Sequence, residues 1–173
     1  MGTFFENRGD EQNMVATKTI TVDLTTKKEV KVSVPSACVD IERDVPESHS
    51  RFNIYISPKS EDLKKLMNLL EKESHSNVVK QVAIWIITND VNREELDSIY
   101  IVRTSSVLNP FFVTTRPAAT NDDVIIALML LEKAGINISN KRIVRERISA
   151  IKGLSSETCQ EFCVSYKYLN WKI

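Results

Sequence analysis

The chain has 173 residues, and 42% of them are hydrophobic, which is enough for one domain with a sizeable core. Its 23 basic residues balance its 23 acidic residues, so no overall field favours nucleic acid or an anionic membrane surface. The longest apolar runs, 82–87 and 124–131, are far shorter than a membrane span. We therefore expect a single domain over residues 1–173, with no nucleic-acid partner and no membrane insertion.

The first third of the chain has the pattern of β-strands. Residues 1–16 show no clear periodicity, and we expect a mobile N-terminal segment there. Further on, apolar residues occupy every second position on both sides of a polar turn at 25–28, which predicts a hairpin over 17–34. Phe52, Ile54 and Ile56 alternate in the same way and predict a further strand that ends before Pro58. The N-terminal part is thus expected to be an antiparallel β structure.

The remainder of the chain has helical patterns. Ser60 is expected to cap a helix with one apolar stripe, and the run 78–88, apolar on every side, is predicted to be a buried helix. A short helix over 93–100 and an edge strand over 111–114 follow. Thr120 and Asp123 form a capping-box pattern for a central helix that ends before Gly135.

Two more helices are predicted after Gly135, over 140–153 and 156–164. The tail 166–171 has aromatic residues at alternate positions and is expected to return as a strand. A β part followed by a part of four to five helices, packed together, predicts an α+β fold.

Gln81 is the one amide in an otherwise apolar run, apart from Lys80 beside it. Burying a carboxamide without a partner costs roughly 1–3 kcal/mol, so Gln81 needs a polar partner or a chemical use. Upstream, Cys38 follows a predicted strand. A thiol and a glutamine side chain can condense to an internal thioester with loss of ammonia. Cys38 and Gln81 are therefore the candidate site residues.

Over about residues 30–90, this pair resembles the thioester domains of bacterial surface adhesins. Their hallmark is a cysteine upstream of a helix that reads apolar, Gln, apolar, any residue, apolar, Trp; here the stretch is Lys80 to Trp85, and Lys80 departs from it. The resemblance implies a non-catalytic extracellular or cell-surface adhesion domain that captures a nucleophile of a protein or surface ligand. Trp85 would then fill the core beside Gln81, and no cofactor is implied.

Two further hypotheses keep the residues but not the thioester. The domain could retain the fold without the bond. Alternatively, Gln81 could hydrogen-bond backbone at a strand edge while Cys38 merely packs, as in an intracellular, cytoplasmic protein-interaction module without covalent chemistry. The sequence leaves the oligomeric state open.

An enzyme would need Cys38 to meet His49 or His75, oriented by Asp40 or Asp44. Nothing in the sequence brings these residues together, and we expect no enzyme. The cysteines and histidines lack a zinc-ligand spacing, so no metal is expected. Cys159 and Cys163 share a helix face and could pair, which would leave Cys38 alone; otherwise all three thiols are reduced.

Overall fold

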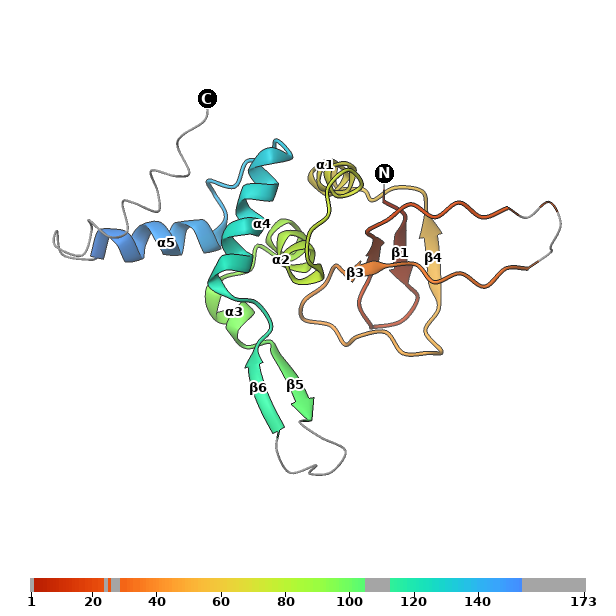
Figure 1. Ribbon diagram of the computed structural model, residues 1–173, viewed down its shortest axis with the longest axis horizontal. Helices are drawn as coiled ribbons and strands as arrows, with labels where there is room; N and C mark the ends of the chain where they lie inside the picture. The colour runs from red at the N-terminus through yellow and green to blue at the C-terminus, as the bar shows by residue number, and fades with distance from the viewer. Residues whose placement is uncertain (1, 24, 26–28, 105–112, 154–173) are drawn as a thin grey trace.

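The structure is a computed structural model that describes residues 2–23, 25, 29–104 and 113–153. A four-stranded sheet lies at one end and a group of helices at the other, and a two-stranded ribbon projects from the helices (Figure 1). An antiparallel sheet followed by five helices in the described residues confirms the predicted α+β class. The predicted helix 156–164 and the tail strand lie outside these residues, as do Cys159 and Cys163.

The sheet consists of β1 (Phe4–Asn7), β2 (Met14–Ala16), β3 (Ser36–Cys38) and β4 (Phe52–Tyr55) in the order β3-β2-β1-β4. All three pairings are antiparallel. The segment 1–16, which we expect to be mobile, contains β1 and β2, the two central strands of the sheet. Strands of three and four residues are too short to show the alternation by which strands are detected.

The hairpin predicted over 17–34 is not formed. In the described part of this segment the chain has no strand, and its two legs leave the sheet as an extended arm (Figure 1). Ile20, Val22, Val30 and Val32 of the arm remain between 38% and 47% exposed. A two-stranded ribbon that buries so little apolar surface is marginal in water, which accounts for the missing ladder.

The helices begin where the sequence places their caps. The Ser60 hydroxyl accepts a hydrogen bond from the Leu63 backbone at the start of α1 (Glu61–Leu70), and Ser76 caps α2 (Asn77–Thr88) in the same way. The predicted capping box of Thr120 and Asp123 is present at α4 (Asn121–Lys133). Gly135, at φ +72°, has the left-handed conformation that follows the end of this helix. The last described helix is α5 (Arg142–Gly153).

Between α2 and α4 the chain differs in detail from the prediction. The helix expected over 93–100 is α3 (Arg93–Asp97), and it gives way to β5 (Tyr100–Thr104). β5 pairs with β6 (Val113–Pro117), which overlaps the strand predicted over 111–114; residues 111 and 112 lie outside the description. The ribbon β5–β6 projects away from the helices (Figure 1).

A single hydrophobic cluster runs from the sheet into the helices, from Val15 and Ala37 through Ile84 to Val124. Helix α2 lies at its centre because it contacts α1, α4 and β3. Helix α4, expected to be central, packs closely on α2 but leaves part of its surface uncovered. Its residues Ile126 and Met129 are 41% and 49% exposed. The fold therefore places α2, with Gln81, directly beside β3, with Cys38.

Candidate functional site

Cys38 lies on an edge strand with its backbone groups directed away from the sheet. Val39 N donates to Asn13 O at 2.9 Å, and Thr17 N donates to Pro35 O at 2.8 Å. Pro35 and Val39, which flank β3, therefore face β2. Because inward and outward residues alternate along an antiparallel strand, the N–H and C=O of Cys38 point to the outer edge. An edge of this kind needs a partner or a cover.

Helix α2 supplies that cover. Gln81 and Thr88 are seven residues apart, which is two helical turns, so they lie on one face of α2. The Thr88 hydroxyl oxygen is 2.8 Å from the Val39 carbonyl oxygen and 2.9 Å from that of Ile84, so it joins the end of β3 to the helix. The face of α2 that bears Gln81 and Thr88 therefore runs along the outer edge of β3.

The structure brings the Gln81 carboxamide to the backbone of Cys38, a contact at a strand edge that was expected as the alternative to a thioester. The Cys38 backbone N–H donates to Gln81 Oε1 at 2.9 Å, and Gln81 Nε2 donates to the Cys38 carbonyl oxygen at 2.6 Å. Both side chains are half-buried. The carboxamide thus takes the place that one residue of a fifth strand would occupy. Since both bonds go to one residue, the Gln81 carbonyl carbon lies opposite the Cys38 Cα. This Cα is joined to Sγ through Cβ.

The surroundings of Cys38 favour the neutral thiol. Burial raises the pKa of the Cys38 thiol, and the nearby charge of Asp40 raises it further. The Asp40 carboxylate is held in place by Asn13, whose backbone N–H and side-chain Nδ2 donate to it at 2.9 and 2.8 Å. A reaction of this thiol therefore requires a group that removes its proton.

Trp85 lies one turn after Gln81 on α2 and packs, half-buried, against the hydrophobic cluster, as expected. Its indole nitrogen is enclosed and has no hydrogen-bond partner among the described residues. Lys80, the residue that departs from the adhesin pattern, is only 8% exposed. Its stem thus packs as an apolar residue would, as the long methylene chain of a lysine permits.

The histidines do not join Cys38. His49 interacts with Glu47 at 3.5 Å, and His75 interacts with Glu73 at 3.2 Å. Neither recorded interaction involves the thiol, so the described residues show no Cys–His dyad. They also contain no cluster of three metal-ligating side chains. Within the same residues, no helix is both long enough and apolar enough to cross a bilayer.

Two parts of this site were not predicted from the sequence. One is Thr88, whose spacing from Gln81 is a signal that could have indicated a shared helix face. The other is the contact between Asn13 and Asp40, for which the sequence holds no signal because it depends on the unpredicted strand β2. Comparison of the chain with protein-family models, with curated proteins and with solved structures gives no match.

Proposed function

We propose that Cys38 and Gln81 condense to an internal thioester, and that the domain uses this bond to capture a nucleophile on a partner. The observation that carries the proposal is the pair of hydrogen bonds between the Gln81 carboxamide and the backbone of Cys38. Both bonds go to backbone groups of Cys38, so they hold the carboxamide beside the residue that carries the thiol. The resemblance to thioester domains of surface adhesins supports an extracellular or cell-surface adhesion role.

The two hydrogen bonds suit the chemistry of condensation. When Sγ attacks the Gln81 carbonyl carbon, negative charge develops on Oε1, which already accepts from the Cys38 N–H. The amide lies in line with the strand, while the Cys38 Cβ stands out of the sheet plane. A thiol turned towards Gln81 would therefore approach one face of the carboxamide, the direction from which a carbonyl carbon is attacked.

The reaction balances without a cofactor. The bond from Sγ to the carbonyl carbon forms, the bond from that carbon to Nε2 breaks, and the thiol proton leaves with the amide nitrogen as ammonia. A partner amine then attacks the same carbon, an amide forms, and the proton of the amine returns to Sγ as the thiol is released. Each molecule reacts once, so the domain is a capture device rather than a turnover enzyme.

Intact mass spectrometry tests this proposal directly. The native chain is expected to lie below its sequence mass by one ammonia. Treatment with methylamine should then raise the mass of the chain to one methylene above the sequence mass. Peptide mapping should place the methylamide on Gln81. Gln12 is a matched control because it is buried and, like Gln81, donates to a backbone carbonyl, that of Arg43 at 2.6 Å. Gln12 must remain unmodified, and Cys38→Ala must abolish both mass changes.

If the thioester between Cys38 and Gln81 does not form, a second function is supported. The same two hydrogen bonds suffice to close the edge of β3, as they would in a protein-interaction module without covalent chemistry. An unmodified mass, with Cys38 fully alkylated in the native protein, would favour this function and reject the thioester.

A further inference from the structure

We propose that the free edge of β4 binds an extended peptide of another protein as an additional strand, and that this peptide is apolar at alternate positions and acidic at its ends. The proposal is independent of the thioester. β4 is the outermost strand on the side of the sheet opposite β3, and among the described residues nothing pairs with its outer edge. A strand edge of this kind is a template for β-augmentation.

The ladder shows which groups of β4 are available. The hydrogen bond from Arg8 N to Arg51 O (2.9 Å) places Arg51 among the residues that face β1. By alternation, Asn53 and Tyr55 also face β1, whereas the N–H and C=O groups of Phe52 and Ile54 point outward. An incoming strand can therefore bond to Phe52 and Ile54 without disturbing the sheet.

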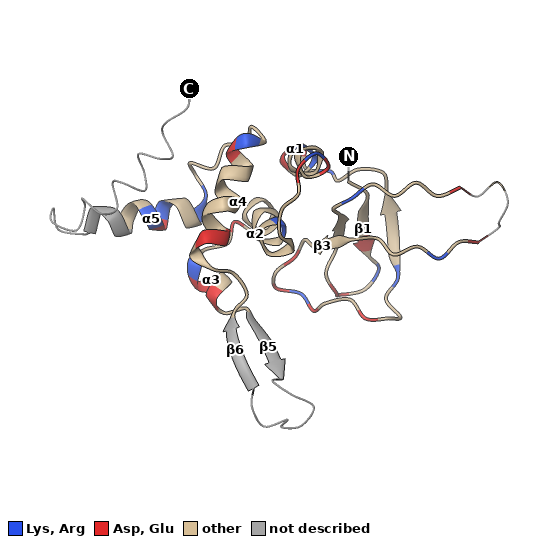
Figure 2. Ribbon diagram, viewed as in Figure 1, with Lys and Arg blue, Asp and Glu red and all other residues tan. Residues whose placement is uncertain are grey.

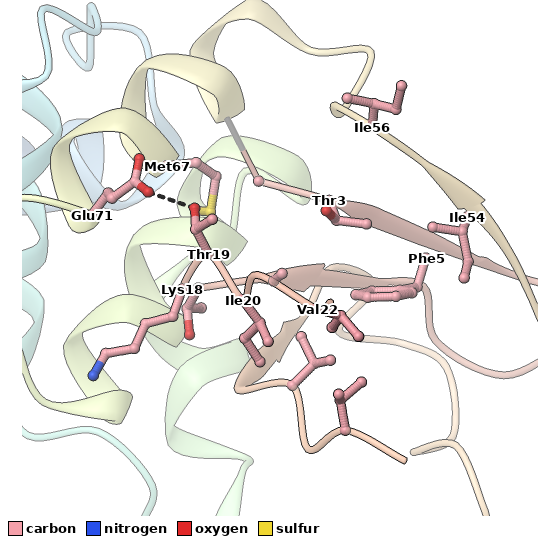
Figure 3. A pocket seen from close by; sticks show the side chains of 15 residues that line it. Thr3, Phe5, Lys18, Thr19, Ile20, Val22, Ile54, Ile56, Met67 and Glu71 are labelled. Carbon is pink, nitrogen blue, oxygen red and sulfur yellow. Dashed lines mark hydrogen bonds between the residues drawn. The ribbon is translucent and has the colours of Figure 1, made fainter. Parts of the chain in front are cut away.

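A cavity lies beside this edge and suits apolar side chains. It has a volume of about 340 Å³ and is bounded by the sheet face and by the arm 17–34. Ile54, Phe5 and Val22 all line it, and Ile54 stands beside Phe5 (Figure 3). Ile54, on the strand, and Ile56, just after it, are 70% and 93% exposed, so two large apolar side chains lie uncovered beside the edge. Because side chains alternate, every second residue of a bound peptide would meet this apolar face, and the others would meet Asn53 and Tyr55.

The charges around the edge select the partner. Arg51 precedes β4 and Lys59 follows it, both are exposed, and residues 51–60 contain no acid (Figure 2). Lys59 Nζ lies 5.9 Å from the centre of the Tyr55 ring, so one cation is held at the end of the strand. Glu6 on β1 accepts from the Tyr55 hydroxyl at 2.9 Å; this bond, and to a smaller degree the charge of Lys59, lowers the pKa of Glu6, so one acid already lies near Lys59 while Arg51 has no acid within residues 51–60. An acidic residue at each end of the peptide would complement the two cations.

The same charges disfavour pairing with a second copy of the chain. If two β4 strands paired about a twofold axis at Ile54, Arg51 of one copy would lie opposite Ser57 of the other. It would then be close to Lys59 of that copy. Like charges across a strand pair are destabilising, and cations on an edge strand are a common means of preventing self-pairing.

Two synthetic peptides test the proposal on the full chain by fluorescence anisotropy. Both alternate valine and threonine over seven residues; one has a glutamate at each end, and the other has a lysine at each end. We expect saturable binding of the glutamate peptide only, weakened by salt. Methylation of its backbone nitrogens should abolish binding. Equal affinity for the two peptides, or no saturable binding of either, would overturn the proposal.

Two substitutions locate the binding. Ile54→Pro removes the outward N–H and should weaken the glutamate peptide about tenfold, the equivalent of one hydrogen bond. This proline should be tolerated because the N–H of Ile54 is not part of the ladder with β1. Val45→Pro is the matched control, since Val45 is 66% exposed in a loop away from β4, and it should leave the affinity unchanged. The double variant Arg51→Glu/Lys59→Glu should reverse the preference towards the lysine peptide.

Self-association is measured in parallel by sedimentation. The chain should remain monomeric at the concentrations used. A dimer that Ile54→Pro dissociates would show that the β4 edge binds a second copy of the chain, which would contradict the proposal. Peptide binding that neither Ile54→Pro nor Arg51→Glu/Lys59→Glu alters would contradict it as well.

Discussion

The two edges of the N-terminal sheet are closed to different degrees. At β3, the outward N–H and C=O of Cys38 are both bonded to the carboxamide of Gln81, and Thr88 holds the next carbonyl group. At β4, the outward groups of Phe52 and Ile54 face away from the sheet, beside exposed apolar side chains. One edge is joined to the core of the molecule, and the other is available to a partner. Substitutions of the same kind at the two edges should therefore have different effects.

The largest effect is expected for Gln81→Ala, measured in a Cys38→Ala background that cannot form the thioester. Both backbone groups of Cys38 would lose their partner, which should lower the free energy of unfolding by about 2–4 kcal/mol. Urea unfolding followed by circular dichroism measures this loss. Val45→Ala, in the exposed loop, should change it very little. A change at Gln81 no larger than that of the control would mean that the carboxamide does not hold the edge.

Proline substitutions compare the two edges directly. Cys38→Pro removes the N–H that donates to Gln81 and should cost about 1–3 kcal/mol. Ile54→Pro removes an outward N–H at the open edge and should cost less than about 0.5 kcal/mol. The urea midpoints of the two variants give the comparison. Equal losses of stability would contradict the difference between the edges.

Thr88→Val tests the second contact of α2 with β3. The valine keeps the shape of the side chain but cannot donate to the Val39 carbonyl oxygen, so a loss of about 1 kcal/mol is expected. Thermal unfolding is sufficient to detect it. An unchanged midpoint would show that Gln81 alone joins the helix to the strand.

The smallest effect concerns the reactivity of Cys38. Asp40 raises the pKa of this thiol, so Asp40→Asn should lower it and shift the rate profile of alkylation towards lower pH. At a fixed pH near neutrality the rate should therefore increase. An asparagine at this position can still accept the hydrogen bonds from Asn13. The measurement uses a Gln81→Leu background, which keeps the thiol free, and mass spectrometry of the peptide that contains Cys38. An unchanged pH profile of alkylation would mean that Asp40 does not influence the Cys38 thiol.

The helices could be predicted from the sequence because their signals are local. Ser60 and Thr120 cap helices that begin at the next residue, and the stripe that follows Ser60 identifies the buried face of α1. Strands β1 to β3 could not be predicted in this way, since three or four residues hold at most two periods of alternation. The arm 17–34 has the alternation of a hairpin but lacks the packing surface that would make it one.

The candidate site was predictable because it rests on one chemical anomaly. An amide in an apolar run requires a partner, and the resemblance to adhesin thioester domains points to Cys38 as that partner. The contact made by Gln81 with the backbone of Cys38 agrees with this expectation, although β3 itself was missed. The open edge of β4 was not predictable, since the exposure of Ile54 and Ile56 depends on the absence of a neighbouring strand within the described fold.

The most direct test of the proposed thioester is the side-chain NH₂ signal of Gln81 in a nitrogen–proton correlation spectrum of the labelled native protein. Condensation with Cys38 releases this nitrogen as ammonia, so the account predicts that the signal is absent and that it appears in Cys38→Ala. A Gln81 NH₂ signal of full intensity in the native chain would contradict the account, because the carboxamide would still be intact.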